Sequence, residues 1–288
     1  MNSLVTVKSL SKKYNDFKLD NISLEIPEGA VMGLIGANGA GKTTLIRLLT
    51  NMCQRDEGEI LIFSKDNLHR EREVKQHLGI VYDSNYFCDN WKISTCETAV
   101  KGFFSSWDSL EFKKMISRFD LNPKQRVNTL SRGMAMKMML AIALSHKAKL
   151  LILDEPTSGL DPFVRDDLMR ILYEYTQRSG CGVLFSTHIT SDLEKIATHI
   201  TFLHRGTLIY TGTKKDFTNT FVGITGQYGS LTDEQKRAII GIKNSSNMFE
   251  GMIKSEKKEM FKKYSTSTLL MEQIMLYIKQ GDENNHGE

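Results

Sequence analysis

The chain has 288 residues, of which 40% are hydrophobic and 25% charged, a composition that can bury a sizeable core. Its formal net charge of +4 is too small to argue for a nucleic-acid partner, and no apolar run approaches the roughly 18 residues of a membrane span. The first residues lack the apolar stretch of a secretory signal and the four cysteines lack a paired metal-binding spacing, so we expect reduced thiols in the cytoplasm.

Short apolar runs and helical patterns follow one another along most of the chain. Apolar runs and alternating patterns predict strands over residues 4–14, 17–27, 31–36, 57–63, 149–156 and 182–188. Helical spacing predicts helices over residues 42–52, 98–119, 131–147, 165–180 and 191–200. The last of these helices carries a capping-box pattern, Ser191 to Glu194, and residues 200–212 read as a hairpin turning at Arg205-Gly206. This alternation predicts an α/β fold with a mainly parallel sheet.

The character of the sequence changes after about residue 216. Runs typical of core strands stop there, and Lys, Glu, Asn and Ser dominate. We therefore expect a large domain over residues 1–215 and a small C-terminal appendage over 216–288. The polar end of that appendage, residues 281–288, is expected to fray.

The segment Gly36–Thr43, GANGAGKT, lies directly after a predicted strand and directly before a predicted helix. It fits the pattern G-x-x-x-x-G-K-[ST] in full, and this context is the one that identifies a phosphate loop. Glycines allow the backbone N–H groups to wrap phosphates, while Lys42 reaches the β- and γ-phosphates and the Thr43 hydroxyl can bind Mg²⁺. The segment predicts a nucleoside triphosphate site.

Two carboxylates end the predicted strand LLILDEP, at the edge where open α/β sheets bind ligands. Asp154 can hold Mg²⁺ through water, and Glu155 can orient and deprotonate an attacking water. After a phosphate loop, this pair predicts hydrolysis of the bound triphosphate.

A second anion site is indicated where the helix after residue 131 begins. Ser131 can cap that helix and Gly133 leaves its first turn accessible, so free N–H groups and the positive dipole end face outwards. Since the chain already has a phosphate loop, the sequence raises the question of whose anion this second site holds.

In this order, the phosphate loop, the segment LSRGM at 130–134, LLILDE at 150–155, SGLD at 158–161 and His188 make the chain resemble the ATP-binding subunit of ABC transporters. The resemblance covers about residues 1–215. It implies a P-loop NTPase core with an antiparallel β subdomain and a helical subdomain at about residues 85–145. It also implies ATP and Mg²⁺ as cofactors.

The resemblance assigns roles to particular positions. It implies Lys42, Glu155 and His188 as catalytic residues, with His188 contacting the γ-phosphate, and it implies metal ligands among Thr43, Asp83 and Asp154. The residues that it implies as nucleotide contacts are Tyr14, Gly36, Asn38, Gly39, Ala40, Gly41, Lys42, Thr43, Thr44, Asp83, Ser131, Gly133 and Asp161. Tyr14 matches the aromatic residue that stacks on adenine; the alternative is a surface tyrosine on an edge strand.

The resemblance also answers the question of the second anion site. LSRGM matches the family signature, usually Leu-Ser-Gly-Gly-Gln, which faces the ATP held by the opposite subunit. Ser131 and the Gly133 N–H would grip that phosphate, and two ATP molecules would join two such chains. Two residues depart from the usual signature, since Arg132 replaces a glycine and Met134 replaces the glutamine.

A further departure lies at Asp83, where the family usually has a Gln near the metal and the attacking water. A carboxylate there either binds Mg²⁺ through water or repels the phosphates. The polar loop that follows carries Tyr86, Phe87 and Trp91. These aromatic residues indicate either a docking surface for a membrane subunit or local packing against the helical subdomain.

The sequence thus predicts an ATPase subunit at the cytoplasmic face of the membrane, paired with a second ATP-binding subunit and a separate transmembrane permease. The C-terminal segments and the LSRGM form resemble peptide- and antibiotic-export ATPases of Gram-positive bacteria, so we expect export of a peptide, antibiotic or other amphipathic cargo. The alternatives are a soluble ABC ATPase acting on ribosomes or DNA and a non-hydrolysing scaffold. A single cassette, the 87 residues between Lys42 and Leu130, and Glu155 argue against these alternatives.

Overall fold

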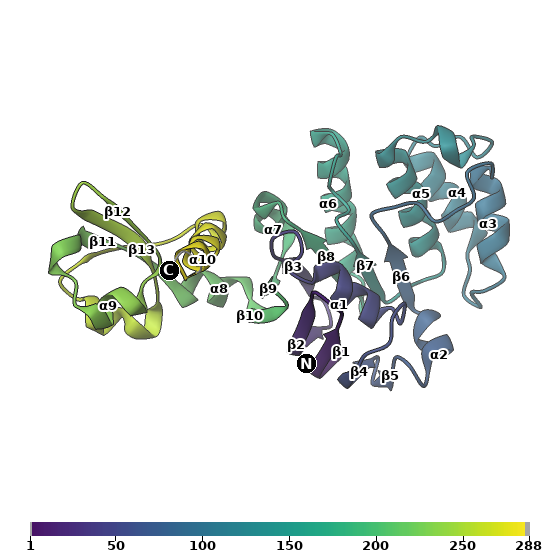
Figure 1. The fold of residues 1–288 in the computed structure, drawn as a ribbon. Coiled ribbons are helices and arrows are strands. Elements are labelled where there is room, and N and C mark those ends of the chain that lie inside the picture. Colours follow the sequence, from purple (N-terminus) through teal and green to yellow (C-terminus); the bar gives the residue numbers. More distant parts are fainter. Residues whose placement is uncertain (1, 286–288) are drawn as a thin grey trace. The chain divides into compact units, whose positions relative to one another are not determined.

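The computed structural model describes residues 2–285 and divides the chain into two compact units, Met1–Thr211 and Gly212–Glu288. The first unit holds every motif singled out above. Its strands and helices are labelled in Figure 1.

A six-stranded sheet in the order β10-β9-β3-β8-β7-β6 forms the centre of the first unit. Its strands are β3 (Val31–Ile35), β6 (Leu78–Val81), β7 (Leu150–Leu153), β8 (Gly182–Thr187), β9 (His199–His204) and β10 (Thr207–Thr213). The pairs β3–β8, β3–β9, β6–β7 and β7–β8 are parallel. Every residue of β3, β7 and β8 is buried, as expected for parallel strands covered on both faces.

The hairpin expected at 200–212 is confirmed, because β9 and β10 are neighbours joined by Arg205 and Gly206. Both connecting residues have positive φ, 46° and 77°, the requirement of a type I′ turn.

A second, antiparallel sheet has the order β2-β1-β4-β5. Its strands are β1 (Ser3–Lys13), β2 (Lys18–Pro27), β4 (Glu57–Ile62) and β5 (Lys65–Asp66). Apolar side chains of β1 and β2 point into a core that also contains Leu45 and Ile46 of α1 (Lys42–Leu49) and Leu34 of β3. The two sheets therefore share one apolar core, and α1 begins between them directly after the phosphate loop.

Helices α3 (Ile93–Lys101), α4 (Ser109–Arg118) and α5 (Arg132–Ser145) form a helical segment beside β6, together with the short η1 (Val127–Thr129) (Figure 1). The remaining helices of the unit are α2 (Glu71–Lys75), α6 (Pro162–Thr176) and α7 (Thr190–Ile196). Because α5 contacts both α4 and β6, it ties the helical segment to the edge of the central sheet.

Two local predictions are wrong. The single helix expected over 98–119 is two helices, because Asp108 accepts hydrogen bonds from the N–H groups of Leu110 and Glu111 and so begins α4. The capping box at Ser191 does not form, since α7 begins one residue earlier with Ile189 as its N-cap. The Ser191 hydroxyl instead accepts a hydrogen bond from Arg165, 2.9 Å away.

The second unit contains an antiparallel sheet in the order β12-β13-β11-β14. Its strands are β11 (Phe221–Gln227), β12 (Ile240–Ser245), β13 (Met248–Lys254) and β14 (Ser265–Ser267). Its helices are α8 (Lys214–Thr220), η2 (Tyr228–Ser230), α9 (Asp233–Ala238), η3 (Ser255–Phe261) and α10 (Met271–Asn285). Helix α10 includes residues 281–285 of the tail expected to fray, and residues 286–288 lie outside the described residues.

Candidate nucleotide site

The phosphate loop connects β3 to α1 in a backbone shape that glycine permits. Gly41, with φ of 106°, forms the N-cap of α1, and a Cβ there would lie 2.9 Å from the Phe17 ring. A Cβ on Gly36 would lie 2.4 Å from the Leu203 carbonyl oxygen. The loop thus packs closely against neighbouring backbone and leaves its other side open.

That open side borders a cavity of about 540 Å³. The described residues that line it are Phe17, Ala37, Asn38, Gly39, Gly41, Lys42, Thr43, Thr44, Asp83, Arg132, Glu155 and Ser158. Most of the predicted phosphate-loop contacts therefore face one space of the size that a nucleotide needs. Gly36 and Ala40 lie behind the loop, where the Ala40 carbonyl accepts a hydrogen bond from the Gly206 N–H at 3.0 Å.

Lys42 and Glu155 line this cavity, and His188, which is not among its lining residues, contacts Glu155. The Lys42 Nζ donates to the Gly36 carbonyl at 2.8 Å and lies 3.2 Å from Glu155 Oε1. The other carboxylate oxygen, Glu155 Oε2, is 2.8 Å from His188 Nδ1. Lys42 is 7% and Glu155 16% exposed at the side chain, so the ion pair is largely shielded from water.

The serine of β8 holds the two carboxylates that follow β7. Ser186 Oγ donates to Asp154 Oδ1 at 2.6 Å and accepts from the Glu155 N–H at 2.8 Å. Ser186 and Asp154 are both buried, which strengthens the bond. Glu155 adopts φ of 48°, uncommon for a non-glycine residue, and the Ser186 contact helps to hold this backbone conformation.

The donors near the loop fit a magnesium ion bound together with phosphates. Thr43 offers a hydroxyl at the cavity wall, and Asp154 offers a carboxylate with one oxygen bonded to Ser186. Mg²⁺ favours such hard oxygen ligands and usually keeps several waters. Within residues 2–285 no cluster of three or more His, Cys, Asp or Glu side chains could hold a metal by itself, so phosphate oxygens would have to complete the set.

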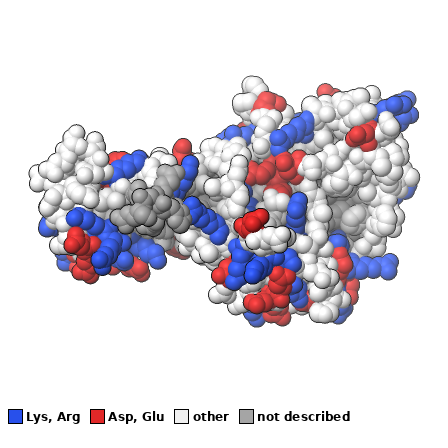
Figure 2. All heavy atoms as spheres, in the orientation of Figure 1, with Lys and Arg blue, Asp and Glu red and all other residues white. Residues whose placement is uncertain are grey.

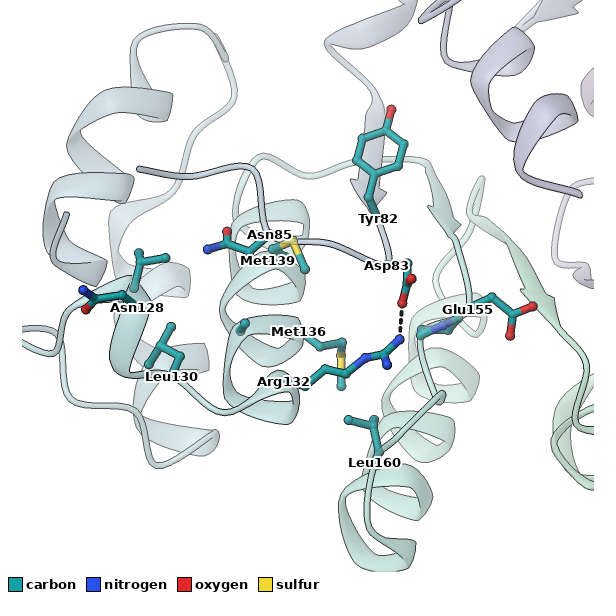
Figure 3. A pocket seen from close by; sticks show the side chains of 13 residues that line it. Tyr82, Asp83, Asn85, Asn128, Leu130, Arg132, Met136, Met139, Glu155 and Leu160 are labelled. Carbon is teal, nitrogen blue, oxygen red and sulfur yellow. Dashed lines mark hydrogen bonds and ion pairs between the residues drawn. The ribbon is translucent and has the colours of Figure 1, made fainter. Parts of the chain in front are cut away.

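Asp83, two residues beyond β6, forms an ion pair with Arg132, the first residue of α5 (Figure 3). Two of the three positions that depart from the usual family residues are therefore in direct contact. Both side chains line the phosphate-loop cavity and also a neighbouring cavity of about 250 Å³. Tyr82 lines that second cavity too, and burial raises the pKa of its phenol.

Two other residues implied by the resemblance have contacts of their own. Tyr14 is 42% exposed, with its hydroxyl 3.7 Å from Cys53 Sγ, while Phe17 lines the cavity in its place. Asp161 caps α6, accepting from the Phe163 and Val164 N–H groups at 3.0 and 3.1 Å.

Ser131 is the N-cap of α5, as predicted, and accepts from the Met134 N–H at 3.3 Å. Neither Ser131 nor Gly133 is among the described residues that line the cavity of the chain's own phosphate loop. The start of α5 is thus separate from that cavity except through the Arg132 side chain.

The aromatic loop after Asp83 packs on itself. The Tyr86 ring centroid lies 4.9 Å from that of Phe87 and 5.9 Å from that of Tyr82, yet Tyr86 is 53% exposed. The backbone of Trp91 accepts a hydrogen bond from Val127 at 2.9 Å. The loop thus shows features of both alternatives, because its rings pack on one another and Tyr86 is also exposed to solvent. On the face drawn in Figure 2, basic and acidic side chains are interspersed.

Sequence reasoning missed Ser186, Phe17 and the network around Asp192. Asp192 is buried on α7 and accepts from Thr157 at 2.7 Å and from Arg165 at 2.5 Å, so it fixes the loop after Glu155 to the helix after His188. The signal for Ser186 was a hydroxyl inside a buried strand beside the predicted acidic pair.

Fold and site together define a P-loop nucleotide-binding protein. A family model described as "ABC transporter" matches residues 19–158. The lantibiotic transport ATP-binding protein SrtF of Streptococcus pyogenes is 32% identical over 212 residues, which cover 72% of this chain and 89% of that protein. The bacitracin transport ATP-binding protein BcrA of Bacillus licheniformis is 28% identical over 213 residues, covering 73% and 69% of the two chains.

Solved structures show the same fold. An ATP-binding subunit of an ABC transporter matches with a TM-score of 0.68 at 24% identity, over 74% of this chain and 91% of that one. A dimeric ATP-binding cassette bound to ADP and phosphate matches with a TM-score of 0.65 at 20% identity, over 73% and 98% of the two chains. The chain belongs to the family of ABC transporter ATP-binding proteins, which are ATPases. Within residues 2–285, no helix combines the length and the apolarity needed to cross a membrane.

Proposed function

We propose that this chain hydrolyses ATP at the Gly36–Thr43 loop and drives a separate membrane permease. The observation that supports this most directly is that Lys42 and Glu155 are paired at the wall of a nucleotide-sized cavity, with His188 in contact with Glu155. A cation, a carboxylate base and an imidazole are the groups that phosphoryl transfer to water requires. The adenine would stack on Phe17, which lines the cavity, in preference to Tyr14.

ATP would reorganise this contact chain. Lys42 neutralises Glu155 at 3.2 Å, and the phosphates of ATP would compete for the same ammonium group. Once Lys42 turns to the phosphates, Glu155 keeps its contact with His188 and becomes free to accept a proton from water. Binding of ATP itself would therefore release the base, and His188 would orient it.

Thr43 and Asp154 are the residues that would hold Mg²⁺, with Ser186 orienting the carboxylate. Bound Mg²⁺ would neutralise charge on the β- and γ-phosphate oxygens. Asp83 has an oxygen bonded to Arg132, so direct metal ligation would require it to leave that partner.

Two such chains would dimerise with Ser131 and the Gly133 N–H of one chain facing the ATP of the other. The start of α5 suits this arrangement, because its free N–H groups and dipole attract a phosphate and it lies apart from the chain's own loop. Peripheral placement on the cytoplasmic face, through a permease, follows from this role. SrtF and BcrA are named for transport of a lantibiotic and of bacitracin, so we propose export of a peptide antibiotic or similar amphipathic cargo.

The test is Glu155→Gln, which keeps shape and removes the base. We expect steady-state ATPase to fall by about a hundredfold or more while ATP binding persists, and ATP to hold two chains together on size-exclusion chromatography with the permease present. Glu174→Gln on α6, an exposed carboxylate 48% open to solvent, is the matched control and should behave as wild type.

Cells carrying Glu155→Gln should become sensitive to the peptide antibiotic that is the cargo, with bacitracin and a lantibiotic as the first two compounds. Unchanged ATPase in Glu155→Gln, or a persistent monomer with ATP and permease, would contradict the proposal.

A further inference from the structure

The Asp83–Arg132 ion pair, together with Glu155, lines two neighbouring cavities. One is the phosphate-loop cavity. The other is lined mainly by apolar side chains, among them Leu130, Met136, Met139 and Leu160. Figure 3 shows the Arg132 side chain extending from the start of α5 towards Asp83, with Glu155 on the far side of Asp83.

Arg132 is positioned from a second side by Gly159. A Cβ on Gly159 would lie 3.2 Å from the Arg132 guanidinium nitrogen Nη1 and 3.5 Å from its Cδ, so the arginine packs over this glycine. The guanidinium therefore sits between the segment after β6 and the segment after Glu155. The segment after β6, the segment after Glu155 and the start of α5 therefore meet at the Arg132 side chain.

Stability alone does not account for the pair. The Asp83 and Arg132 side chains are 54% and 48% exposed, and ion pairs of that exposure contribute little to folding. Their placement suggests an electrostatic role instead, because both line the cavity that receives the phosphates. A lone carboxylate there would repel a triphosphate, and a guanidinium bonded to it cancels that repulsion.

We propose that Arg132 is a positioning residue for the chain's own nucleotide site, which neutralises Asp83 and holds it at the cavity wall. The inference rests on the proposed ATP site. It gives α5, the helix that begins in the LSRGM segment, a function at the nucleotide site of its own chain. It makes a signed prediction: the loss of Arg132 should weaken nucleotide binding, and the further loss of the Asp83 carboxylate should restore it.

The experiment is a double-mutant cycle with Arg132→Ala and Asp83→Asn, read out as the affinity for Mg²⁺ with a non-hydrolysable ATP analogue by calorimetry. Arg132→Ala is expected to weaken binding roughly tenfold, the effect of one partly screened unit charge several ångströms away. The double variant should bind within about threefold of wild type, and Asp83→Asn, which leaves the guanidinium unpaired, should bind at least as tightly as wild type. Arg132→Lys, which keeps the charge, should largely restore binding.

The chain offers a matched control pair in Arg118 of α4 and Glu174 of α6, 3.2 Å apart and 35% and 48% exposed. It also joins the helical segment to the core, yet neither residue lines a described cavity. Arg118→Ala and Glu174→Gln should leave analogue affinity unchanged, and urea midpoints should show that all variants fold.

A double variant that binds as weakly as Arg132→Ala would overturn the inference, as would an Arg132→Ala loss no larger than that of Arg118→Ala. Lys42→Ala distinguishes a failure of the proposed ATP site from a failure of the proposed role of Arg132. If Lys42→Ala binds the analogue as wild type does, the ATP site itself is wrongly placed. If it abolishes binding and Asp83→Asn does not restore binding to Arg132→Ala, only the role of Arg132 fails.

Discussion

Ser186→Ala tests whether the buried hydroxyl of β8 organises the two carboxylates after β7. The substitution removes one atom, so the cavity left behind is small. It deletes the donor to Asp154 Oδ1 at 2.6 Å and the acceptor of the Glu155 N–H at 2.8 Å. Ser186 has no exposed surface and Asp154 is 4% exposed, so water reaches neither group readily to replace the lost bonds.

The magnitude follows from the two bonds. A hydrogen bond to a carboxylate contributes about 1.5–3 kcal/mol, and an N–H left without its partner costs about 1 kcal/mol. We expect the free energy of unfolding to fall by about 3 kcal/mol. For a unit of this size that corresponds to a decrease of roughly 6–12 °C in Tm.

The assay is urea and thermal unfolding of the full chain, followed by far-UV circular dichroism, with and without Mg²⁺ and ATP. Ser145→Ala is the control, because Ser145 is also fully buried but donates to the Ala141 carbonyl of its own helix. That helix retains its backbone bonds without the hydroxyl, so we expect a loss below about 1 kcal/mol. Mg²⁺ and ATP should narrow the gap between Ser186→Ala and wild type, since a bound ion gives Asp154 a new partner.

A Ser186→Ala protein that unfolds within 0.5 kcal/mol of the Ser145→Ala protein (about the additivity error of such comparisons) would refute this reasoning. It would mean that Asp154 and the Glu155 N–H find other partners at no cost. The proposed magnesium position would then lose its structural support.

Three further outcomes are expected. Lys42→Ala should abolish tight ATP binding in calorimetry, since no other lysine lines the cavity among residues 2–285. His146, stacked on Phe104 at 3.9 Å, has its pKa lowered from 6.5 to about 4 by burial, so the unfolded chain binds its proton more readily. Stability from this group is present above pH 6.5 and is lost as the pH falls towards 4, by about 2 kcal/mol between pH 7 and 5; His146→Phe should flatten that part of the urea profile. Trp91→Ala should leave basal ATPase unchanged and reduce stimulation by the permease if the aromatic loop docks; equal stimulation would favour local packing.

The phosphate loop could be predicted because its information is local. The segment Gly36–Thr43 carries its glycines, lysine and threonine within eight residues, between a buried strand and a helix. The cap at Ser131 and the turn at Arg205-Gly206 were equally local, and both are confirmed. Each depends on backbone geometry that a few neighbouring residues determine.

Contacts between distant segments could not be predicted in this way. Asp83 and Arg132 are 49 positions apart, and Glu155 and Ser186 are 31 apart. Glu155 and Ser186 meet because the parallel strands β7 and β8 pair, and Asp83 meets Arg132 because α5 contacts β6. In both cases helices separate the two partners along the chain, so no local pattern contains the contact. Phe17 reaches the cavity from the residues before β2, where its ring lies beside Gly41, whereas Tyr14 was selected from its place in the sequence alone.

The strands of the second unit were missed because their pattern is weak. In β13, Gly251, Met252 and Ile253 are buried in succession, and in β11 two glycines and one threonine interrupt the apolar residues. Neither strand shows the alternation that predicts a half-buried strand. The burial comes from packing with η3 and α10, which a local pattern does not contain.

The structure also changes how the two unusual residues should be interpreted. Taken separately, a carboxylate in place of glutamine at 83 adds a negative charge beside the phosphates, and an arginine in place of glycine at 132 adds a positive charge to a helix start. In contact, the two changes cancel, so the formal charge around the cavity equals that of the usual family pattern. A substitution at either position alone would break this balance, because a charge without its partner acts on the triphosphate directly. The relevant unit is therefore the pair, and its effect on ATP binding can be measured only when both residues are varied together.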